Sequence, residues 1–215
     1  MRYLKLADVR KAHFEDDLKA YLIGQIFLPK GQQNTGHDMT RMARLELNAR
    51  MPMFSDATRQ LILRSQMFAL IEMVVNMNRE ADILYLAEHG FAVAKLQFAN
   101  KELFIKAIPY ILNREEEIPY NLREMIVEQS SDIYELYTKS KRHKELFPRM
   151  LADPRCPPDL LVEIFNQKKT DPTISLGSGV MGRLEEMLAS GKIYVVRKPS
   201  LIKEEPSEDR NVPKP

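Results

Sequence analysis

The longest strongly apolar stretch of the chain runs from Ser55 to Asn78, and it constrains the fold more than any other feature. Its apolar residues recur at helical spacing and also fall on the neighbouring faces of the helix: Leu61, Ile62, Leu63, Met67, Phe68, Leu70, Ile71, Val74, Val75 and Met77. A helix that is apolar nearly all round is either buried or spans a membrane. Polar residues such as Arg64 and Glu72 interrupt the stretch before it reaches the roughly 18 residues of a membrane span. We therefore predict a buried central helix over residues 56–78.

The remainder of the chain favours an all-α fold, either an irregular helical bundle or a short α-solenoid of helical hairpins. Eight glycines and few Val- or Thr-rich segments with alternating polarity argue against an extensive β-sheet. A content of 44% hydrophobic and 29% charged residues is typical of a globular protein. We expect an N-terminal helical bundle over residues 1–99, repeat-like helical hairpins packed on it over 100–192, and a short extended segment with a disordered tail over 193–215.

Capping and breaking residues divide the chain into helices. A first amphipathic helix is expected over residues 6–27, ended by the Pro29 region, and Ser55 or Asp56 is expected to cap the central helix. Asn100 is expected to cap a later helix that Pro109 kinks or ends. A helix is also predicted over residues 180–189.

Two segments of the chain after residue 100 recur. The sequence Lys-Glu-Leu-Phe at residues 101–104 returns at 144–147, and Ile-Pro-Tyr-Asn-Leu at 118–122 is echoed by Cys-Pro-Pro-Asp-Leu at 156–160. The stretch FPRMLADPRCPPDLLVEIF, residues 147–165, resembles the short helix–proline-turn–helix units of leucine-rich-variant and HEAT-like repeat proteins. The resemblance covers about residues 100–166. It implies a helical scaffold whose exposed groove binds another molecule, and it implies no chemistry.

Several classes of protein are disfavoured by the motifs. The chain contains neither a P-loop nor a G-x-S-x-G nucleophile motif. The sequence GSGVMG at residues 177–182 matches G-x-G-x-x-G but lacks the surrounding βαβ unit, so a linker before the last helix is the favoured interpretation. The single cysteine, Cys156, excludes an internal disulfide and is interpreted as a turn residue. With no secretory signal or membrane span expected, we predict a cytoplasmic protein, or a nuclear one in a eukaryotic host.

A basic run is the most prominent candidate binding site. Because the net charge is only +2, nucleic-acid binding would need such a local patch. The residues that could neutralise phosphates, or the acidic surface of a partner protein, are Lys139, Lys141, Arg142, Lys144, Arg149 and Arg155. The alternative interpretation is a solvated turn between helices.

An enzyme with an unfamiliar helical site is a third hypothesis. His13, Asp16 and Asp17 have the spacing of one helix face and could supply part of a metal site, and His37 could join an anion site in its loop. No further ligand is suggested, so we predict no metal, no cofactor and no catalytic residue.

The leading hypothesis is a non-enzymatic protein–protein interaction or assembly protein, either a scaffold or a subunit of a larger complex, viral complexes included. Twelve methionines could line an adaptable groove, although filling the core is the favoured use of methionine here. The expected partner is another protein or further copies of the chain, without a membrane. The alternative is a nucleic-acid-associated accessory factor that uses the basic run.

Overall fold

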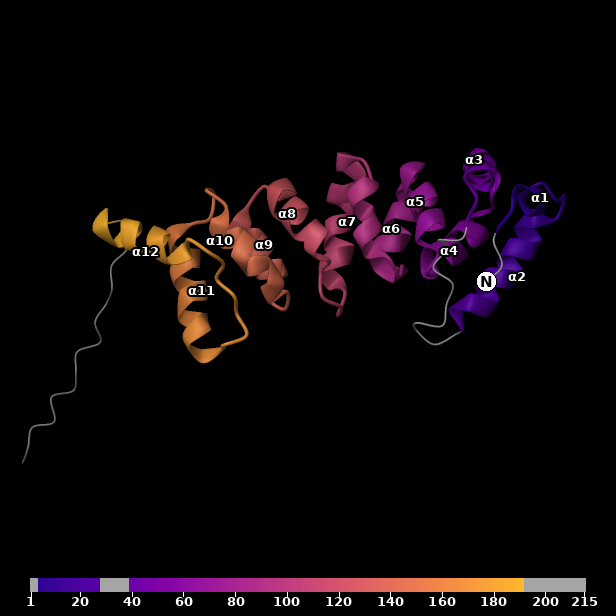
Figure 1. Ribbon diagram of the computed structural model, residues 1–215. Helices are drawn as coiled ribbons and strands as arrows, with labels where there is room; N and C mark the ends of the chain where they lie inside the picture. Colours follow the sequence, from indigo (N-terminus) through magenta and orange to yellow (C-terminus); the bar gives the residue numbers. More distant parts are fainter. Residues whose placement is uncertain (1–3, 28–38, 192–215) are drawn as a thin grey trace, which may run out of the picture.

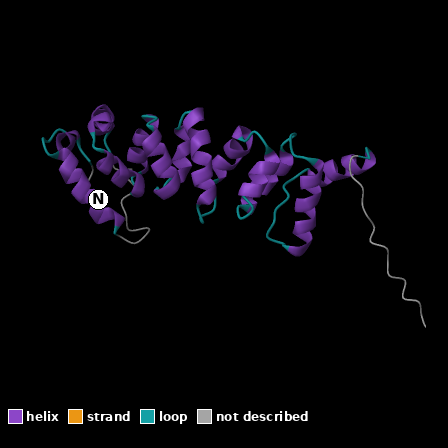
Figure 2. Ribbon diagram, turned by 180° about the vertical axis from the view of Figure 1, so that it is seen from behind, coloured by secondary structure: helices purple, strands orange, loops and turns teal. Residues whose placement is uncertain are grey.

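The chain folds into helices throughout the part that the structure describes. The computed structural model describes residues 4–27 and 39–191, and within these ranges it has no strand, only an isolated bridge between Leu4 and Met39 (Figure 2). The predicted all-α fold is confirmed. The extended segment and tail expected over 193–215 lie outside the described residues.

The elements are α1 (Leu6–Val9), α2 (Phe14–Ile26), α3 (Arg41–Arg50), η1 (Met51–Met53), α4 (Asp56–Arg64), α5 (Phe68–Asn76), α6 (Glu80–His89), η2 (Val93–Phe98), α7 (Lys101–Asn113), α8 (Tyr120–Gln129), α9 (Ile133–Lys139), η3 (Lys144–Leu146), α10 (Phe147–Ala152), α11 (Pro158–Thr170) and α12 (Val180–Ala189), where η marks a 3-10 helix. They follow one another along a single axis, with α1 to α3 at one end and α11 and α12 at the other (Figure 1).

Most of the helices between α2 and α10 form two layers. In the first layer α2 packs on α4, α4 on α6 and α6 on α7; in the second layer α5 packs on η2, η2 on α8 and α8 on α10. Consecutive elements of the two layers also contact one another, as in the pairs α4–α5, α6–η2 and α7–α8. Because each element packs mainly on its near neighbours in sequence, the molecule is an elongated stack and takes the α-solenoid form of the two predicted.

The predicted central helix over 56–78 is divided in two. Ser55 caps α4, as expected, by accepting a hydrogen bond from the Thr58 N–H. The helix ends at Ser65, whose buried hydroxyl donates to the Ile62 carbonyl at 2.7 Å and accepts from the Met67 N–H at 3.1 Å. A side chain that satisfies these backbone groups offers the chain an alternative to the helical ladder. The apolar stretch is therefore buried as two helices, one in each layer.

Other boundaries differ in smaller ways. The helix expected over residues 6–27 is two helices, α1 and α2. Asn100 caps α7 as predicted, and Pro109 lies inside α7, which continues to Asn113. The helix predicted over 180–189 is confirmed as α12.

The recurring Lys-Glu-Leu-Phe segments have different places in the fold. Residues 101–104 begin α7 in the first layer, whereas residues 144–146 form η3 and Phe147 begins α10 in the second layer. The resemblance to known helical repeats stays a prediction. Packing of α6 on α7 crosses the expected boundary between residues 99 and 100, and the division into an N-terminal bundle and repeat-like hairpins also stays a prediction.

Arginine side chains join parts of the stack that are separated by a similar distance in sequence. In each case a guanidinium donates to main-chain carbonyls that lie 25 to 32 residues earlier. Four of the five arginines reach carbonyls at or near the end of an α-helix. Such carbonyls have no hydrogen-bond partner within the helix. The pairs are Arg79 with Pro52, Arg114 with Ala87 and Glu88, Arg142 with Leu112, Arg155 with Val127 and Ser130, and Arg183 with Leu151, Asp153 and Cys156.

Candidate functional site

A cleft of about 570 Å³ opens where the first layer connects to the second. Its sides are the connection between α6 and η2, residues 90–92, and the connection between α7 and α8, residues 114–119. At this level the second layer consists of η2, a six-residue 3-10 helix that packs on α5 and on α8.

Two phenylalanines form the apolar part of the cleft. The rings of Phe68 and Phe91 lie 6.2 Å apart between centroids, and Phe91 is 40% exposed. The Phe91 N–H donates to the Leu63 carbonyl at 3.1 Å, which ties the connection to the end of α4. Gly90 leaves no room for a side chain at the end of α6, because a Cβ atom there would lie only 2.7 Å from the Leu86 carbonyl oxygen of the same helix.

One cation of the cleft is left without a charged partner. Lys95 Nζ pairs with the Glu72 carboxylate at 2.8 Å, and the Arg114 guanidinium pairs with Glu116 at 3.3 Å. Arg64 at the end of α4 is exposed, and no ion pair involves it within residues 4–27 and 39–191. The cleft therefore places an available positive charge beside two aromatic rings.

The basic run extends from Lys139, the last residue of α9, to Arg155, shortly before α11, and each of its six residues contacts another group of the chain. Arg142 and Arg155 donate to carbonyls of the preceding unit, as described above. Lys144 pairs with the Asp171 carboxylate, and this bond lowers the pKa of Asp171 to about 2. Arg149 donates to the Tyr120 hydroxyl at 2.8 Å.

The other two residues of the basic run make more local contacts. Lys139 pairs with Glu135 one helical turn earlier at 2.5 Å, and the Lys141 ammonium lies 5.6 Å from the centre of the Tyr137 ring. Both side chains are exposed. Four of the six predicted binding residues therefore link different units of the stack, and whether the run binds nucleic acid stays a prediction.

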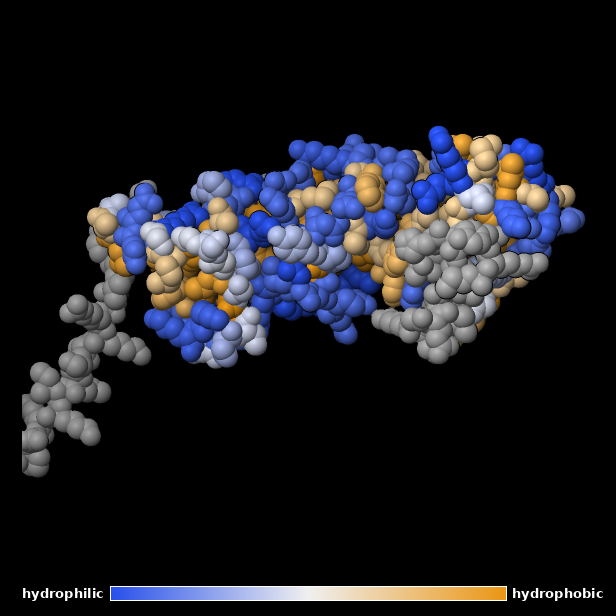
Figure 3. All heavy atoms as spheres, in the orientation of Figure 1, coloured by the Kyte–Doolittle hydropathy of each residue, from blue (hydrophilic) through white to orange (hydrophobic). Residues whose placement is uncertain are grey.

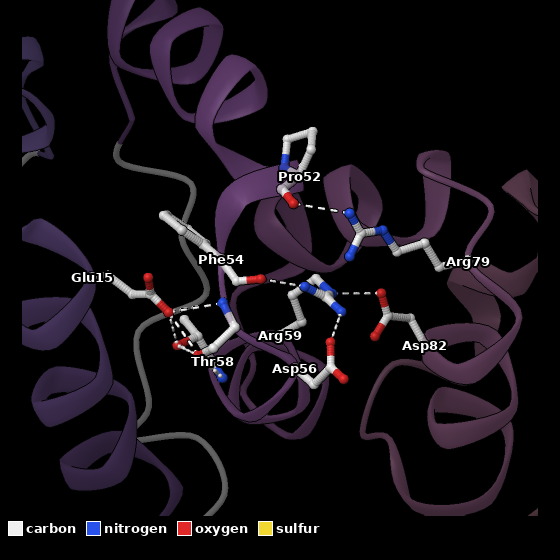
Figure 4. A network of polar contacts seen from close by, with 9 residues as sticks. Glu15, Pro52, Phe54, Asp56, Thr58, Arg59, Arg79 and Asp82 are labelled. Carbon is white, nitrogen blue, oxygen red and sulfur yellow. Dashed lines mark hydrogen bonds and ion pairs between the residues drawn. The ribbon is translucent and has the colours of Figure 1, made fainter.

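A buried polar network joins α2, α4 and α6 (Figure 4). Arg59 and Asp82 are each 3% exposed, and the Arg59 Nε donates to Asp82 Oδ2 at 2.7 Å. The same guanidinium bonds to the Phe54 carbonyl and to the Asp56 carboxylate. Burial raises the pKa of the Asp82 carboxyl, an effect that the bond to Arg59 opposes. These groups satisfy one another, so the network positions helices.

Glu15 belongs to the same network. Its carboxylate accepts hydrogen bonds from the Thr58 hydroxyl at 2.6 Å and from the Ser55 hydroxyl at 2.7 Å. The hydrogen bond from Thr58 is the main cause that lowers the pKa of Glu15 to about 2. Local spacing favoured its neighbours Asp16 and Asp17 instead, since no local signal reveals partners 40 and 43 residues away.

The other candidate residues are dispersed. His13 precedes α2, Asp16 and Asp17 are exposed in its first turn, and His37 lies outside the described residues. In the described part of the chain no three potential ligands are grouped for a metal ion. Cys156 is buried, and burial raises the pKa of its thiol to about 11.

No protein-family model, curated protein or solved structure matches this chain. Of the helices in residues 4–27 and 39–191, none combines the length and apolar character needed to cross a membrane. The class of molecule is therefore defined by its own architecture: a short all-α stack with an open cleft along one edge.

Proposed function

We propose that this protein is a non-enzymatic interaction or assembly protein, a scaffold or complex subunit, that holds a segment of a partner protein in the cleft. The observation that supports this most is the pair of exposed and half-buried rings, Phe91 and Phe68, beside the charge of Arg64. Helical stacks present extended surfaces of this kind to their partners. The cytoplasm or nucleus is the proposed location.

The chemistry of the cleft suggests what the partner segment contains. An apolar anchor would cover the Phe68 and Phe91 rings, and a carboxylate beside that anchor would pair with the Arg64 guanidinium. Aromatic and arginine side chains carry a large share of the binding free energy in protein interfaces. We therefore expect a partner segment in which an apolar side chain stands next to an acidic one.

The test uses two phenylalanines of the same region. The full chain is used to capture partners from its native source with nuclease present, as wild type and as the variants Phe91→Ala and Phe98→Ala. Phe98 is 41% exposed, about the same as Phe91, and lies in η2 but does not line the cleft. Loss of a stoichiometric partner with Phe91→Ala, and its retention with Phe98→Ala, is the expected result. Equal retention by both variants would refute the role of the cleft.

Charge reversal at Arg64 tests the second part of the recognition. Arg64→Glu should weaken capture of the same partner more strongly at low salt than at high salt, because the lost interaction is electrostatic. The matched control is Arg10→Glu, which reverses another exposed arginine outside the cleft.

Nucleic-acid binding by the basic run is the competing proposal, and the same capture distinguishes it. A bound fraction that disappears with nuclease, and that weakens with salt, would favour this alternative. The diagnostic variant is Lys139→Ala/Lys141→Ala, because it removes two charges without removing the contacts that join units of the stack. Unchanged recovery of the partner by this variant is the result expected from the cleft proposal.

A further inference from the structure

Two helices at opposite ends of the stack expose apolar side chains. On α3, Met42 and Leu45 are exposed while Ala43 and Leu47 are fully buried. On α12, the exposed apolar residues are Met181 and Leu188. Terminal units of a helical stack usually need a polar outer face, because they lack a neighbour on one side. These two helices depart from that rule.

The charges beside the two apolar faces have opposite sign. Arg41 and Arg44 are exposed on α3, and Glu185 and Glu186 are exposed on α12. None of these four side chains forms an ion pair with another described residue. Figure 3 shows the orange apolar surface beside blue polar surface at the end of the molecule where α3 lies. Each face thus combines two apolar residues with two charges that lack a described partner.

We propose that α3 of one copy of this chain docks on α12 of a second copy, so that the stacks associate head to tail. Met42 and Leu45 would pack against Met181 and Leu188, and the arginines would face the glutamates. Contact between two α3 faces, or between two α12 faces, would instead oppose like charges, which is unfavourable at an interface. The contact is therefore heterologous.

In a dimer formed by a heterologous contact, one α3 face and one α12 face remain free. Further copies can therefore add until an open chain or a closed ring has formed. None of the residues in the two faces lines the cleft. The inference thus goes beyond the proposed function, and loss of partner capture through the cleft would leave it unaffected.

The first measurement is sedimentation velocity of the full chain over a wide range of protein concentration, at low and at high salt. The expected result is a mass that rises with concentration beyond that of a dimer and falls with added salt. A wild-type chain that remains monomeric at every concentration and at low salt would overturn the proposal.

A charge exchange tests the pairing itself. The variants Arg41→Glu/Arg44→Glu and Glu185→Arg/Glu186→Arg should each lose association, because each places like charges on both faces. An equimolar mixture of the two variants should associate again, since every α3 face then finds an α12 face of opposite charge. The variant that carries all four substitutions should associate alone. Association of either double variant by itself, or no recovery in the mixture with both variants folded by circular dichroism, would contradict the proposed contact.

Discussion

At the scale of single residues, the most consequential group is the guanidinium of Arg59. It is buried between α4 and α6, where it depends on the Asp82 carboxylate and the Phe54 carbonyl. A buried charge that loses its partner keeps the cost of desolvation without the compensating attraction. Two carboxylates contact this guanidinium, one buried and one 81% exposed, which provides a matched pair of variants.

We predict that Asp82→Ala lowers the free energy of unfolding by about 3–5 kcal/mol, because it leaves Arg59 buried without its main partner. Asp56→Ala should cost no more than about 1 kcal/mol, since exposed ion pairs contribute little. Urea denaturation followed by circular dichroism measures both. Equal losses in the two variants would show that burial of the pair does not control stability here.

Glu15 should make the free energy of unfolding depend on pH. Its hydrogen bond from Thr58 lowers its pKa from 4.5 to about 2 in the folded chain, so its contribution is fully present above pH 4.5 and is lost as the pH falls towards 2. Glu15→Gln should remove this part of the pH dependence of the urea midpoint. Asp16→Asn, at an exposed neighbouring carboxylate, is the control and should retain it. A Glu15 carboxyl that titrates near 4.5 by nuclear magnetic resonance would contradict the assignment.

At the scale of the elements, the break between α4 and α5 decides how the apolar stretch is used. One long helix would place all of its apolar faces in a single layer, whereas the break at Ser65 sends α5 into the second layer against η2. The cleft depends on this arrangement, since Arg64 and Phe68 stand on either side of the break.

Ser65→Ala should destabilise the protein by about 1–3 kcal/mol, because it leaves the buried Met67 N–H without its acceptor. Ser130→Ala is the control. Its hydroxyl donates to the Ile126 carbonyl within the same helix end, and no N–H of residues 4–27 and 39–191 donates to it. Thermal unfolding compares the two variants, and a loss for Ser130→Ala as large as that for Ser65→Ala would contradict the role of the break.

At the scale of the whole molecule, stability is expected to be distributed along the stack. Each unit contacts mainly its near neighbours, and the arginine-to-carbonyl contacts join one unit to the next. In such a stack, stability is approximately the sum of the contributions of units and of the interfaces between them. A destabilising substitution should therefore lower the stability of the helices around it more than that of distant helices.

Hydrogen exchange measures this distribution. In the Asp82→Ala variant, amides of α4 and α6 should lose protection, while those of α10 and α11 should keep most of theirs. A uniform loss of protection from α2 to α11 would show that the described stack unfolds as one cooperative unit. The wild-type protein under the same conditions is the reference.

Local patterns predicted many of the individual elements. Ser55 and Asn100 cap helices because a hydroxyl or amide three residues before a backbone N–H can satisfy that group, and such spacing is visible in the sequence. The basic run was equally visible, but its contacts were not, since Arg142 and Arg155 bond to carbonyls 25 to 30 residues away. The cleft around Phe91 had no local signal, because its sides come from connections far apart in the chain.

The sequence by itself determined that the chain is all-α, where several helices begin, and that the stretch from Ser55 to Asn78 is largely buried, because helical periodicity and capping are properties of neighbouring residues. Only the tertiary structure decided that this stretch forms two helices and that the helices align in layers. It also decided that Arg64 lines the same cleft as Phe91, and that Arg59 is buried with Asp82. The physical reason is that packing and desolvation act between side chains that folding brings together, whatever their separation along the chain.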